Sequence, residues 1–358
     1  MKELKVLDTN AEFSFLGGDL MEKVAKRMSM IHIDQMAFMG FVDVVKNISK
    51  IKHNFKIVKQ DILNYKPDVV ILVDYPGFNL RMAKWAKKRG LKVFYYISPS
   101  VWAWKEKRVE TIKKYVDKLF VILPFEEAFY AKHNCKVTFV GHPLLDAIEE
   151  RKKTMLSREA FISKNNLSQK ELIAVLPGSR KQELHRMFKI MLEIKNNFKD
   201  YELVIAGTSN IPQKLYRKAI DKGFKVVMDQ TYELMQYAKA GVIKSGTSTL
   251  EAALFELPQV VCYRSGRLTI LIAKQLVSKD LKYISLVNLI MDKEIVKELI
   301  QKEMTAKNIS EELNKLLNEK SHRETIISEY KELKTKLGGV GASKRLAQAI
   351  HSDLMNSK

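Results

Sequence analysis

Short apolar runs alternate with helical segments along most of this sequence, and that order constrains the fold more than any other feature. In the first half the predicted strands are residues 69–73, 93–97, 118–123 and 137–140, and the helices between them are 80–89 and 105–115. Strands separated by helices predict a parallel sheet, whose ligands bind beyond the carboxyl ends of the strands. Asp74 and the Ser98-Pro99-Ser100 segment are therefore expected at the reactive edge.

The second half repeats this organisation after a charged connection at residues 149–169. Its predicted strands are 173–176, 203–206, 226–228, 241–243 and 259–262. Because 358 residues are too many for one ordinary core, we predict an α/β protein with two Rossmann-like domains that face a cleft. The predicted domains are 1–150 and 170–330, followed by a helical segment, 331–358, that could return to the first domain.

The start of the chain departs from this organisation. Residues 1–7 are typical of the end of a helix, followed by a turn at Asp8 and a short strand, 12–16, that ends at Gly17-Gly18. A doubly wound half should instead begin with a strand and a glycine-rich loop. We expect both to be missing from this sequence.

The net charge of +21, from 62 Lys and Arg against 41 Asp and Glu, predicts an anionic partner. Nucleic acid, acidic lipid headgroups and phosphorylated substrates all meet that description. The sequence has no RNP, zinc-finger or helix-turn-helix signature, and its lysines are spread along the chain, so nucleic acid is disfavoured.

Composition and motif spacing disfavour several other classes of protein. No apolar run is long enough to span a bilayer, and the N-terminus has no apolar signal-peptide core. The two cysteines, Cys135 and Cys262, are too far apart for a metal or redox motif and fit a reducing cytosol. No Asp-x-Asp motif occurs, so we expect neither a metal ion nor another cofactor in the site.

Residues 35–59 combine an apolar helical stripe with interleaved lysines. The stripe includes Phe41, Ile48 and Phe55, and an apolar cluster, Met36-Ala37-Phe38-Met39, stands at its start. One interpretation is an amphipathic core helix. The other is a lysine-ringed apolar patch that dips into an acidic membrane interface. Different faces of the segment could serve each purpose.

Residues 244–261, KSGTSTLEAALFELPQVV, predict a strand end, a tight turn, a helix and the next strand. A helix that starts with small residues favours an anion, because its free N–H groups lie at the positive end of the helix dipole. Glu251 in this helix could accept both hydroxyls of a ribose. The alternative is a well-capped structural helix.

The loop Pro177-Gly178-Ser179-Arg180 follows a predicted buried strand in the same half. Its backbone N–H groups and the Arg180 guanidinium could converge on a diphosphate, since the planar guanidinium forms bidentate bonds and keeps its charge. Together with Ser245-Gly246-Thr247 and Glu251, this loop predicts a nucleotide-diphosphate site.

Asp74 ends a run of five apolar residues in the first half. It could hydrogen-bond the turn backbone, or it could be a general base that takes a proton from an attacking hydroxyl. Displacement at a sugar's anomeric carbon by that hydroxyl would invert the centre in one step. Taken alone, Trp102, Trp104, His142 and Asn288 are better explained by structure than by chemistry.

Seven motifs, in order along nearly the whole chain, resemble those of the lipid-A-disaccharide synthase family. They are VDYPGFN at 73–79, SPSVWAW at 98–104, LPFE at 123–126, GHP at 141–143, LPGSR at 176–180, SGTSTLE at 245–251 and LVNL at 286–289. The resemblance implies an inverting glycosyltransferase of the GT-B type, which joins UDP-2,3-diacylglucosamine to 2,3-diacylglucosamine 1-phosphate (lipid X). The implied products are a β-1,6 disaccharide and UDP.

The resemblance also implies roles for individual residues. Asp74 would be the base on the acceptor's 6-hydroxyl, and Arg180 would bind the diphosphate. The full set implied around the UDP-sugar is Gly178, Ser179, Arg180, Ser245, Gly246, Thr247, Glu251 and Asn288. Met36, Phe38, Met39 and Phe41 fall where family members have an apolar surface that docks on the membrane. The implied location is the inner face of the inner membrane of a Gram-negative cell, as a peripheral protein; a homodimer is left open.

The sequence departs from the family in two places. Family members open with a strand and a G-E-x-S-G-D-type loop, whereas this sequence starts in the helix that follows; we expect that the recorded start is too late. Gly77 stands where some relatives carry a second acidic residue, which leaves Asp74 as the base of that motif.

Two other functions stay open. One is another UDP-sugar enzyme of the same fold, such as a UDP-N-acetylglucosamine epimerase or a peptidoglycan glycosyltransferase, although VDYPGFN and SPSVWAW favour the synthase. The other is a truncated, inactive protein that binds UDP.

Overall fold

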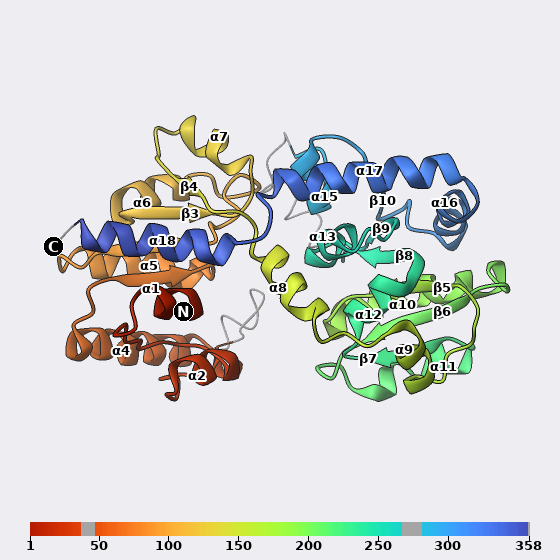
Figure 1. The fold of residues 1–358 in the computed structure, drawn as a ribbon, viewed down its shortest axis with the longest axis horizontal. Helices are drawn as coiled ribbons and strands as arrows, with labels where there is room; N and C mark the ends of the chain where they lie inside the picture. Colours follow the sequence, from red (N-terminus) through yellow and green to blue (C-terminus); the bar gives the residue numbers. More distant parts are fainter. Residues whose placement is uncertain (37–46, 267–280, 357–358) are drawn as a thin grey trace. The chain divides into compact units, whose positions relative to one another are not determined.

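The computed structural model describes residues 1–36, 47–266 and 281–356. The chain forms two compact units. Unit 1 contains Met1–Trp102, Glu106–Pro143 and Gly341–Lys358, and unit 2 contains Ala103–Lys105 and Leu144–Val340. Each unit is an α/β structure with a parallel sheet of its own (Figure 1).

Unit 1 is built on a four-stranded sheet with the order β1-β2-β3-β4. The strands are β1 (Val70–Val73), β2 (Val93–Tyr96), β3 (Lys118–Val121) and β4 (Thr138–Phe139). All neighbouring strands are parallel, with Val70 opposite Val93 and Phe120 opposite Thr138. The predicted parallel sheet is confirmed, and its carboxyl ends meet at one edge.

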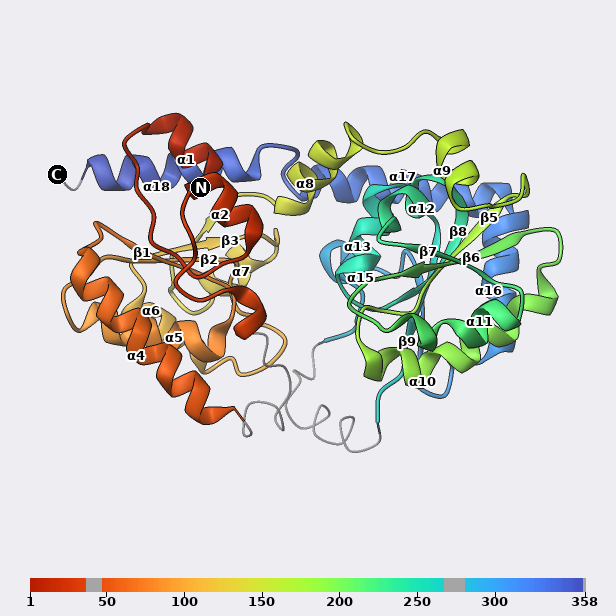
Figure 2. The ribbon, with the colours of Figure 1, turned by 90° about the horizontal axis from the view of Figure 1, so that it is seen from below.

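Helices cover both faces of this sheet (Figure 2). One face carries α4 (Ile48–Tyr65), α5 (Pro76–Lys87) and α6 (Arg108–Tyr115), and the other carries α1 (Lys2–Leu7) and α18 (Ala342–Met355). Met82 and Tyr95 are buried on the first face. Phe94 and Ile350 are buried together in a second cluster. The C-terminal helix therefore contributes to the core of the unit in which the chain begins.

Unit 2 has a six-stranded parallel sheet with the order β10-β9-β8-β5-β6-β7. The strands are β5 (Leu172–Leu176), β6 (Glu202–Gly207), β7 (Lys225–Met228), β8 (Ala238–Lys244), β9 (Gln259–Tyr263) and β10 (Lys297–Ile300). All five residues of β5 are buried, as expected for a central strand covered on both faces.

The helices of unit 2 lie on both faces of this sheet, with α10 and α12 on opposite faces (Figure 2). The described residues of this part of the chain form the α-helices α8 (Pro143–Lys152), α9 (Arg158–Lys164), α10 (Lys181–Leu192), α11 (Arg217–Asp221), α12 (Thr231–Tyr237), α13 (Thr247–Leu254), α15 (Leu286–Met291), α16 (Ala306–Asn318) and α17 (Lys320–Lys336). Short 3₁₀ helices occur at η2 (Glu193–Asn197) and η3 (Gln213–Leu215).

The predicted strand at residues 12–16 is wrong. The segment between α1 and α2 (Asp19–Ala25) is irregular, apart from one parallel bridge between Gly17 and His32. Phe15 is buried, but its carbonyl accepts from the N–H of Met30 and is not part of a ladder. The apolar side chain anchors a loop there, and among the described residues no strand pairs with this segment.

The helix predicted at residues 35–59 is described in part, because residues 37–46 lie outside the described residues. Gln35 ends a 3₁₀ turn, η1 (Ile33–Gln35), and α4 begins at Ile48 and extends to Tyr65. Val58, which belongs to the predicted stripe, is buried, and buried Ile62 continues the stripe beyond the predicted end. Lys66, in the left-handed conformation, ends the helix by donating its N–H to the carbonyl of Ile62.

The two units divide the chain at Pro143 and Gly341. The ranges expected from the sequence ended at 150 and 330, so the structure assigns residues 144–150 and the helix α17 to unit 2. Within the C-terminal segment, α18 belongs to unit 1 and contacts α1.

Candidate functional site

Asp74 lies directly after β1, at the carboxyl edge of the unit 1 sheet. Its N–H still donates to the carbonyl of Tyr96 at 3.0 Å. Its φ of 45° and the φ of 44° at Tyr75 are both in the left-handed region. Non-glycine residues in that region cost about 1–3 kcal/mol each, so this turn must be held by its surroundings.

Side chains from β2 and α5 hold the turn. The Tyr95 hydroxyl donates to the carbonyl oxygen of Asp74. The Asn79 amide donates to the carbonyls of Val73 and Asp74 at 2.9 and 2.7 Å. Asp74 as a residue is exposed, and none of these bonds uses its carboxylate. Partial desolvation by its surroundings raises the pKa of this carboxyl, and a hydrogen bond from the Tyr75 backbone offsets part of that change.

A buried polar cluster lies behind the loops that follow β2 and β3. Glu126 is 1% exposed and accepts from the N–H groups of Ile122 and Leu123 at 3.2 and 2.9 Å. Ser98 is also buried, and its hydroxyl lies 2.6 Å from the Tyr130 hydroxyl. Burial raises the pKa of Glu126 to about 7, while the two backbone N–H groups, Ser98 and Trp102 favour the ionised form.

Trp102 and His142 of these motifs are packed inside unit 1, whereas Trp104 is exposed. The Trp102 ring lies edge-on to Phe125, with centroids 5.0 Å apart. His142 is buried, and burial lowers its pKa to about 4, so the imidazole is neutral at physiological pH. Trp104 is 38% exposed, with the Lys105 ammonium 4.5 Å from its ring centre.

In unit 2, the loop after β5 presents Ser179 and Arg180 as exposed residues. Gly178 has a φ of 104°, a conformation that only glycine adopts without strain. Arg180 is the N-cap residue of α10. Strand β8 pairs with β5 in parallel, so the loops that follow these two strands are neighbours at the same edge.

The loop after β8 is the one that contains Ser245, Gly246 and Thr247. Ser245 is buried, and its hydroxyl donates to the carbonyl of Ile284 at 3.0 Å, so this side chain fixes the loop. Gly246 is the N-cap of α13, and Thr247 is its exposed first residue. The first N–H groups of a helix have no acceptor within the helix, which makes this end suited to an anion.

Glu251 lies one turn further along α13, where it is partly buried. The Tyr232 hydroxyl donates to Glu251 Oε1 at 2.8 Å. Burial raises the pKa of the Glu251 carboxyl, and the bond from Tyr232 opposes that shift. The carboxylate is therefore already bound to one phenol of the protein.

The amide of Asn288, predicted to contact UDP, is instead hydrogen-bonded within unit 2. Its Nδ2 donates to the Val296 carbonyl and to Glu298 Oε1, at 2.8 and 2.9 Å. Its Oδ1 accepts from the N–H groups of Ile295 and Val296, at 2.8 and 3.0 Å. An amide side chain has two donor hydrogens and two acceptor positions, so all four are used inside unit 2. Asn288 is fully buried and joins α15 to the segment before β10.

A groove of about 670 Å³ runs between α4 and α5 in unit 1. Apolar side chains and five cations line it: Ile48, Ile51, Phe55, Leu63, Trp85, Lys52, Lys56, Lys59, Arg81 and Arg89, with Gln60. Lys59 lies 5.5 Å from the ring centres of both Phe55 and Trp85. The described residues of this lining include no carboxylate, so the groove suits an anionic amphiphile.

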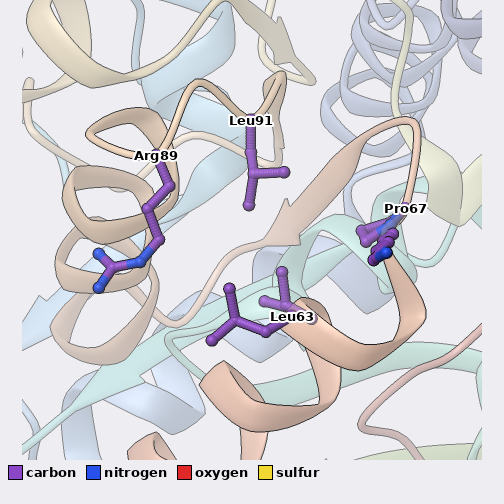
Figure 3. Close-up of a pocket in the computed structure, with 6 residues that line it drawn as sticks. Leu63, Pro67, Arg89 and Leu91 are labelled. Carbon is purple, nitrogen blue, oxygen red and sulfur yellow. The ribbon is translucent and has the colours of Figure 1, made fainter.

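A smaller depression of about 370 Å³ shares Leu63 and Arg89 with this groove. Figure 3 shows the side chains of Leu63, from α4, and Leu91, from the chain after α5, directed toward each other across it. The residues that line the two depressions form one apolar and basic surface along α4, which we call the α4–α5 face.

Three of the four residues predicted to touch a membrane, Phe38, Met39 and Phe41, lie outside the described residues. The fourth, Met36, is half-buried, lies against the core of unit 1, and its carbonyl accepts from the Tyr75 hydroxyl at 3.3 Å. None of the described helices has both the length and the apolar character needed to cross a membrane. The described parts of the chain contain no group of three or more His, Cys, Asp or Glu side chains that could hold a metal ion.

Sequence reasoning missed two residues that the structure connects to the candidate site. Tyr232 lies 19 positions before Glu251, and only the folded sheet brings the two side chains together. Glu126 belongs to the LPFE motif, which marked its position but not its burial or its acceptor role.

Solved structures with the same architecture define the fold class of the protein. UDP-GlcNAc 2-epimerase from Neisseria meningitidis, bound to UDP-GlcNAc, matches 99% of this chain and 94% of its own with a TM-score of 0.61 at 12% identity. CalG4, the calicheamicin glycosyltransferase, matches 99% of this chain and 93% of its own with a TM-score of 0.58 at 13% identity. At these identities the likeness shows the fold, which is the α/β fold of GT-B glycosyltransferases and epimerases.

Sequence comparison narrows this class to one family. The family described as Lipid-A-disaccharide synthetase matches residues 1–351. Lipid-A-disaccharide synthase from Coxiella burnetii (strain CbuG_Q212) is 34% identical over 356 residues, which cover 98% of this chain and 93% of the relative. The synthase from Syntrophus aciditrophicus (strain SB) is 37% identical over 320 residues, 87% of this chain and 82% of the relative. The chain belongs to the lipid-A-disaccharide synthase family and is a glycosyltransferase, which confirms the resemblance of the seven motifs.

Proposed function

We propose that this protein joins UDP-2,3-diacylglucosamine to 2,3-diacylglucosamine 1-phosphate, giving the β-1,6 disaccharide 1-phosphate and UDP. Membership of the family over residues 1–351 supports this pair of substrates. The observation that carries the chemistry is the Asp74 carboxylate, exposed on a strained turn that Tyr95 and Asn79 brace at the carboxyl end of β1.

In the proposed reaction, Asp74 accepts the proton of the acceptor's 6-hydroxyl. The hydroxyl oxygen forms a bond to the anomeric carbon of the donor sugar, and the bond from that carbon to the UDP oxygen breaks. The electron pair of the broken bond leaves with UDP. Attack opposite to the leaving group inverts the anomeric centre, so one carboxylate is enough. The raised pKa of Asp74 makes it a stronger base than an ordinary aspartate.

The donor is proposed to bind in unit 2. Arg180, Gly178 and Ser179 after β5 would bind the diphosphate together with the start of α13 at Gly246 and Thr247. Arg180 and the helix end would stabilise the charge that develops on UDP. Glu251 would accept from the ribose hydroxyls. Ser245 and Asn288, whose side chains are used within the unit, would hold these loops in place.

The test is release of UDP from the two acylated glucosamines in detergent micelles. Asp74→Asn should lower kcat by about 10²- to 10⁴-fold, because it removes a general base. UDP affinity, measured by calorimetry, should be unchanged, since the base acts in the transition state. UDP release by Asp74→Asn at the wild-type rate would refute the role of Asp74.

A matched control is Asp68→Asn. Asp68 is an exposed aspartate just before β1, at the opposite end of the same strand. The Asp68→Asn substitution changes the net charge by the same amount as Asp74→Asn but should leave kcat unchanged. UDP release that does not depend on the acceptor would argue for a different UDP-sugar enzyme.

We also propose that the α4–α5 face contacts the anionic surface of a membrane. The substrates are acylated, and the groove combines apolar side chains with five cations. Met36, Phe38, Met39 and Phe41 precede α4 in the sequence, and we propose that their apolar side chains join this contact.

A further inference from the structure

Tyr232 of α12 is a polar contact of the donor residues that no motif marks. Its hydroxyl donates to Glu251 Oε1 at 2.8 Å. Its ring lies against Phe255, just after α13, with ring centroids 5.1 Å apart and planes at 49°. The Tyr232 ring therefore packs against the residue that follows α13, while its hydroxyl binds Glu251 within α13.

The helix that presents Tyr232 is tied down on both sides of it. Gln230 and Asn165 exchange a pair of amide hydrogen bonds, at 3.1 and 3.2 Å. Glu233 is 2% exposed and accepts from the Arg151 guanidinium at 3.0 Å. These neighbours fix the backbone of α12 immediately before and after Tyr232, so the position of its hydroxyl is set by the fold.

The bond from Tyr232 has two effects on Glu251. It restricts the rotation of the carboxylate by holding Oε1, which leaves Oε2 as the oxygen that turns to other donors. It also favours the ionised carboxylate, which is acceptor-only, against the burial that favours the protonated one. A vicinal diol is a pair of donors that such an oriented, ionised carboxylate can accept.

We propose that Tyr232 is a positioning residue for the ribose of the donor: its hydroxyl orients Glu251 so that the carboxylate accepts from the 2′- and 3′-hydroxyls of uridine diphosphate. This inference rests on the proposed function, in which Glu251 binds the ribose. It adds a selective element, since a nucleotide without the two hydroxyls gains nothing from the Tyr232 contact.

The test measures the affinities of UDP and of 2′,3′-dideoxy-UDP for the full chain by calorimetry. Tyr232→Phe keeps the ring and its contact with Phe255 but removes the donor. Its affinity for UDP should fall about three- to tenfold, the size expected for one ordinary hydrogen bond, because Tyr232 acts on the ribose only through Glu251. Its affinity for 2′,3′-dideoxy-UDP should equal that of the wild type, because the acceptor that Tyr232 orients has no donor to meet.

Tyr237→Phe is the matched control. Tyr237 ends the same helix, and its hydroxyl donates to the Leu156 carbonyl at 2.7 Å. Removing that hydroxyl costs one partly buried hydrogen bond without touching Glu251, so both affinities should stay at the wild-type values. Equal melting temperatures of the two variants show that α12 is intact in each.

Glu251→Gln separates the inference from the function on which it rests. If the wild type prefers UDP to the dideoxy nucleotide and Glu251→Gln loses that preference, Glu251 binds the ribose. Tyr232→Phe must then lose affinity for UDP alone; an unchanged affinity, or an equal loss for both nucleotides, overturns the positioning role. If Glu251→Gln keeps the wild-type preference, the ribose contact itself is refuted, and the role of Tyr232 fails with it.

Discussion

The carboxyl group of Glu126 is a buried acid held by backbone N–H groups, with no cation among the causes of its shifted pKa. Burial raises its pKa from 4.5 to about 7. In an unfolded chain the same carboxyl would lose its proton near pH 4.5. Between these two values the folded protein holds a proton that the unfolded protein has released, so this group lowers the stability as the pH rises.

Glu126→Gln should remove that pH dependence. A glutamine can still accept from the N–H groups of Ile122 and Leu123, but it is never ionised. Relative to the wild type, the free energy of unfolding of the variant should rise between pH 4.5 and 7 and reach a gain of up to about 3 kcal/mol above pH 8. Urea unfolding at a series of pH values measures this difference.

The neighbouring Glu127→Gln is the control. Glu127 is exposed and accepts from the N–H of Phe139 at 3.1 Å. It should keep the pH profile of the wild type. A Glu126→Gln profile parallel to that of the wild type would contradict the protonation of Glu126 in the folded state at mildly acidic pH.

At the scale of residues, the sequence predicts positions better than conformations. Asp74 is confirmed at the end of a strand because the five apolar residues before it determine where the strand runs. Its left-handed φ could not be predicted, because the turn is held by Tyr95 and Asn79 and contains no glycine before Gly77. The contact between Tyr232 and Glu251 was equally hidden, since it depends on how two helices lie on one sheet.

At the scale of elements, Glu298 and Asn288 connect β10 to the loop after β8. Glu298 accepts from the N–H groups of Ile284 and Ser285, both at 2.9 Å. It also accepts from Asn288, while the Ile284 carbonyl accepts from Ser245. The loop proposed to bind UDP is therefore fixed through a chain of buried polar contacts to the edge strand of the sheet.

Asn288→Ala should destabilise unit 2 severely. It leaves the N–H groups of Ile295 and Val296 and the Val296 carbonyl without a partner in a fully buried site. Each buried group left unpaired costs about 1–3 kcal/mol, so we expect a loss of at least about 3 kcal/mol in urea unfolding. Asn308→Ala, which removes a bond of 2.8 Å from an exposed amide, should cost less than about 1 kcal/mol.

This pair of variants also tests the placement of Asn288. A loss of UDP affinity by Asn288→Ala without a loss of stability would mean that the amide contacts the nucleotide. That result would contradict the structure, in which all four hydrogen-bonding positions of the amide are occupied inside the unit.

The elements that the sequence predicted well are those whose apolar pattern is continuous. Strands β5 and β9 are buried runs, and both were predicted. Strand β10 was missed because its four residues, KELI, carry two apolar side chains, and its Glu298 is a buried acceptor. The segment at residues 12–16 had a strand-like pattern but pairs with no strand in the described part of the chain, which a single sequence cannot reveal.

At the scale of the whole molecule, the order of strands and helices was enough to predict two parallel sheets, and seven spaced motifs were enough to predict the family. The bounds of the units could not be predicted, because the apolar residues of α17 and α18 do not say on which sheet each helix lies. What separates them is the Gly338-Gly339 break and the apolar surface on which each one lies: α17 contacts α13 and α15, whereas α18 contacts α1.

The net charge of +21 leads to the last prediction, which concerns membrane binding. Vesicles of phosphatidylglycerol and phosphatidylcholine should bind the protein, and vesicles of phosphatidylcholine alone should bind it weakly. Each lysine near an anionic surface contributes about 1 kcal/mol, so replacing Lys52 and Lys56 of the α4–α5 face by glutamates, which the surface also repels, should weaken binding by at least about 30-fold. Cosedimentation of Lys52→Glu/Lys56→Glu with the vesicles measures this loss.

Lys218→Glu/Lys222→Glu separates the effect of this face from that of total charge. Both lysines are exposed in unit 2, and the substitution changes the net charge by the same amount. If the α4–α5 face is the contact, this control should bind nearly as the wild type does, while raising the salt from about 0.1 to 0.5 M should weaken the binding of both. Equal losses in the two double variants would mean that overall charge drives association. The apolar side chains of the groove would then have no part in membrane binding.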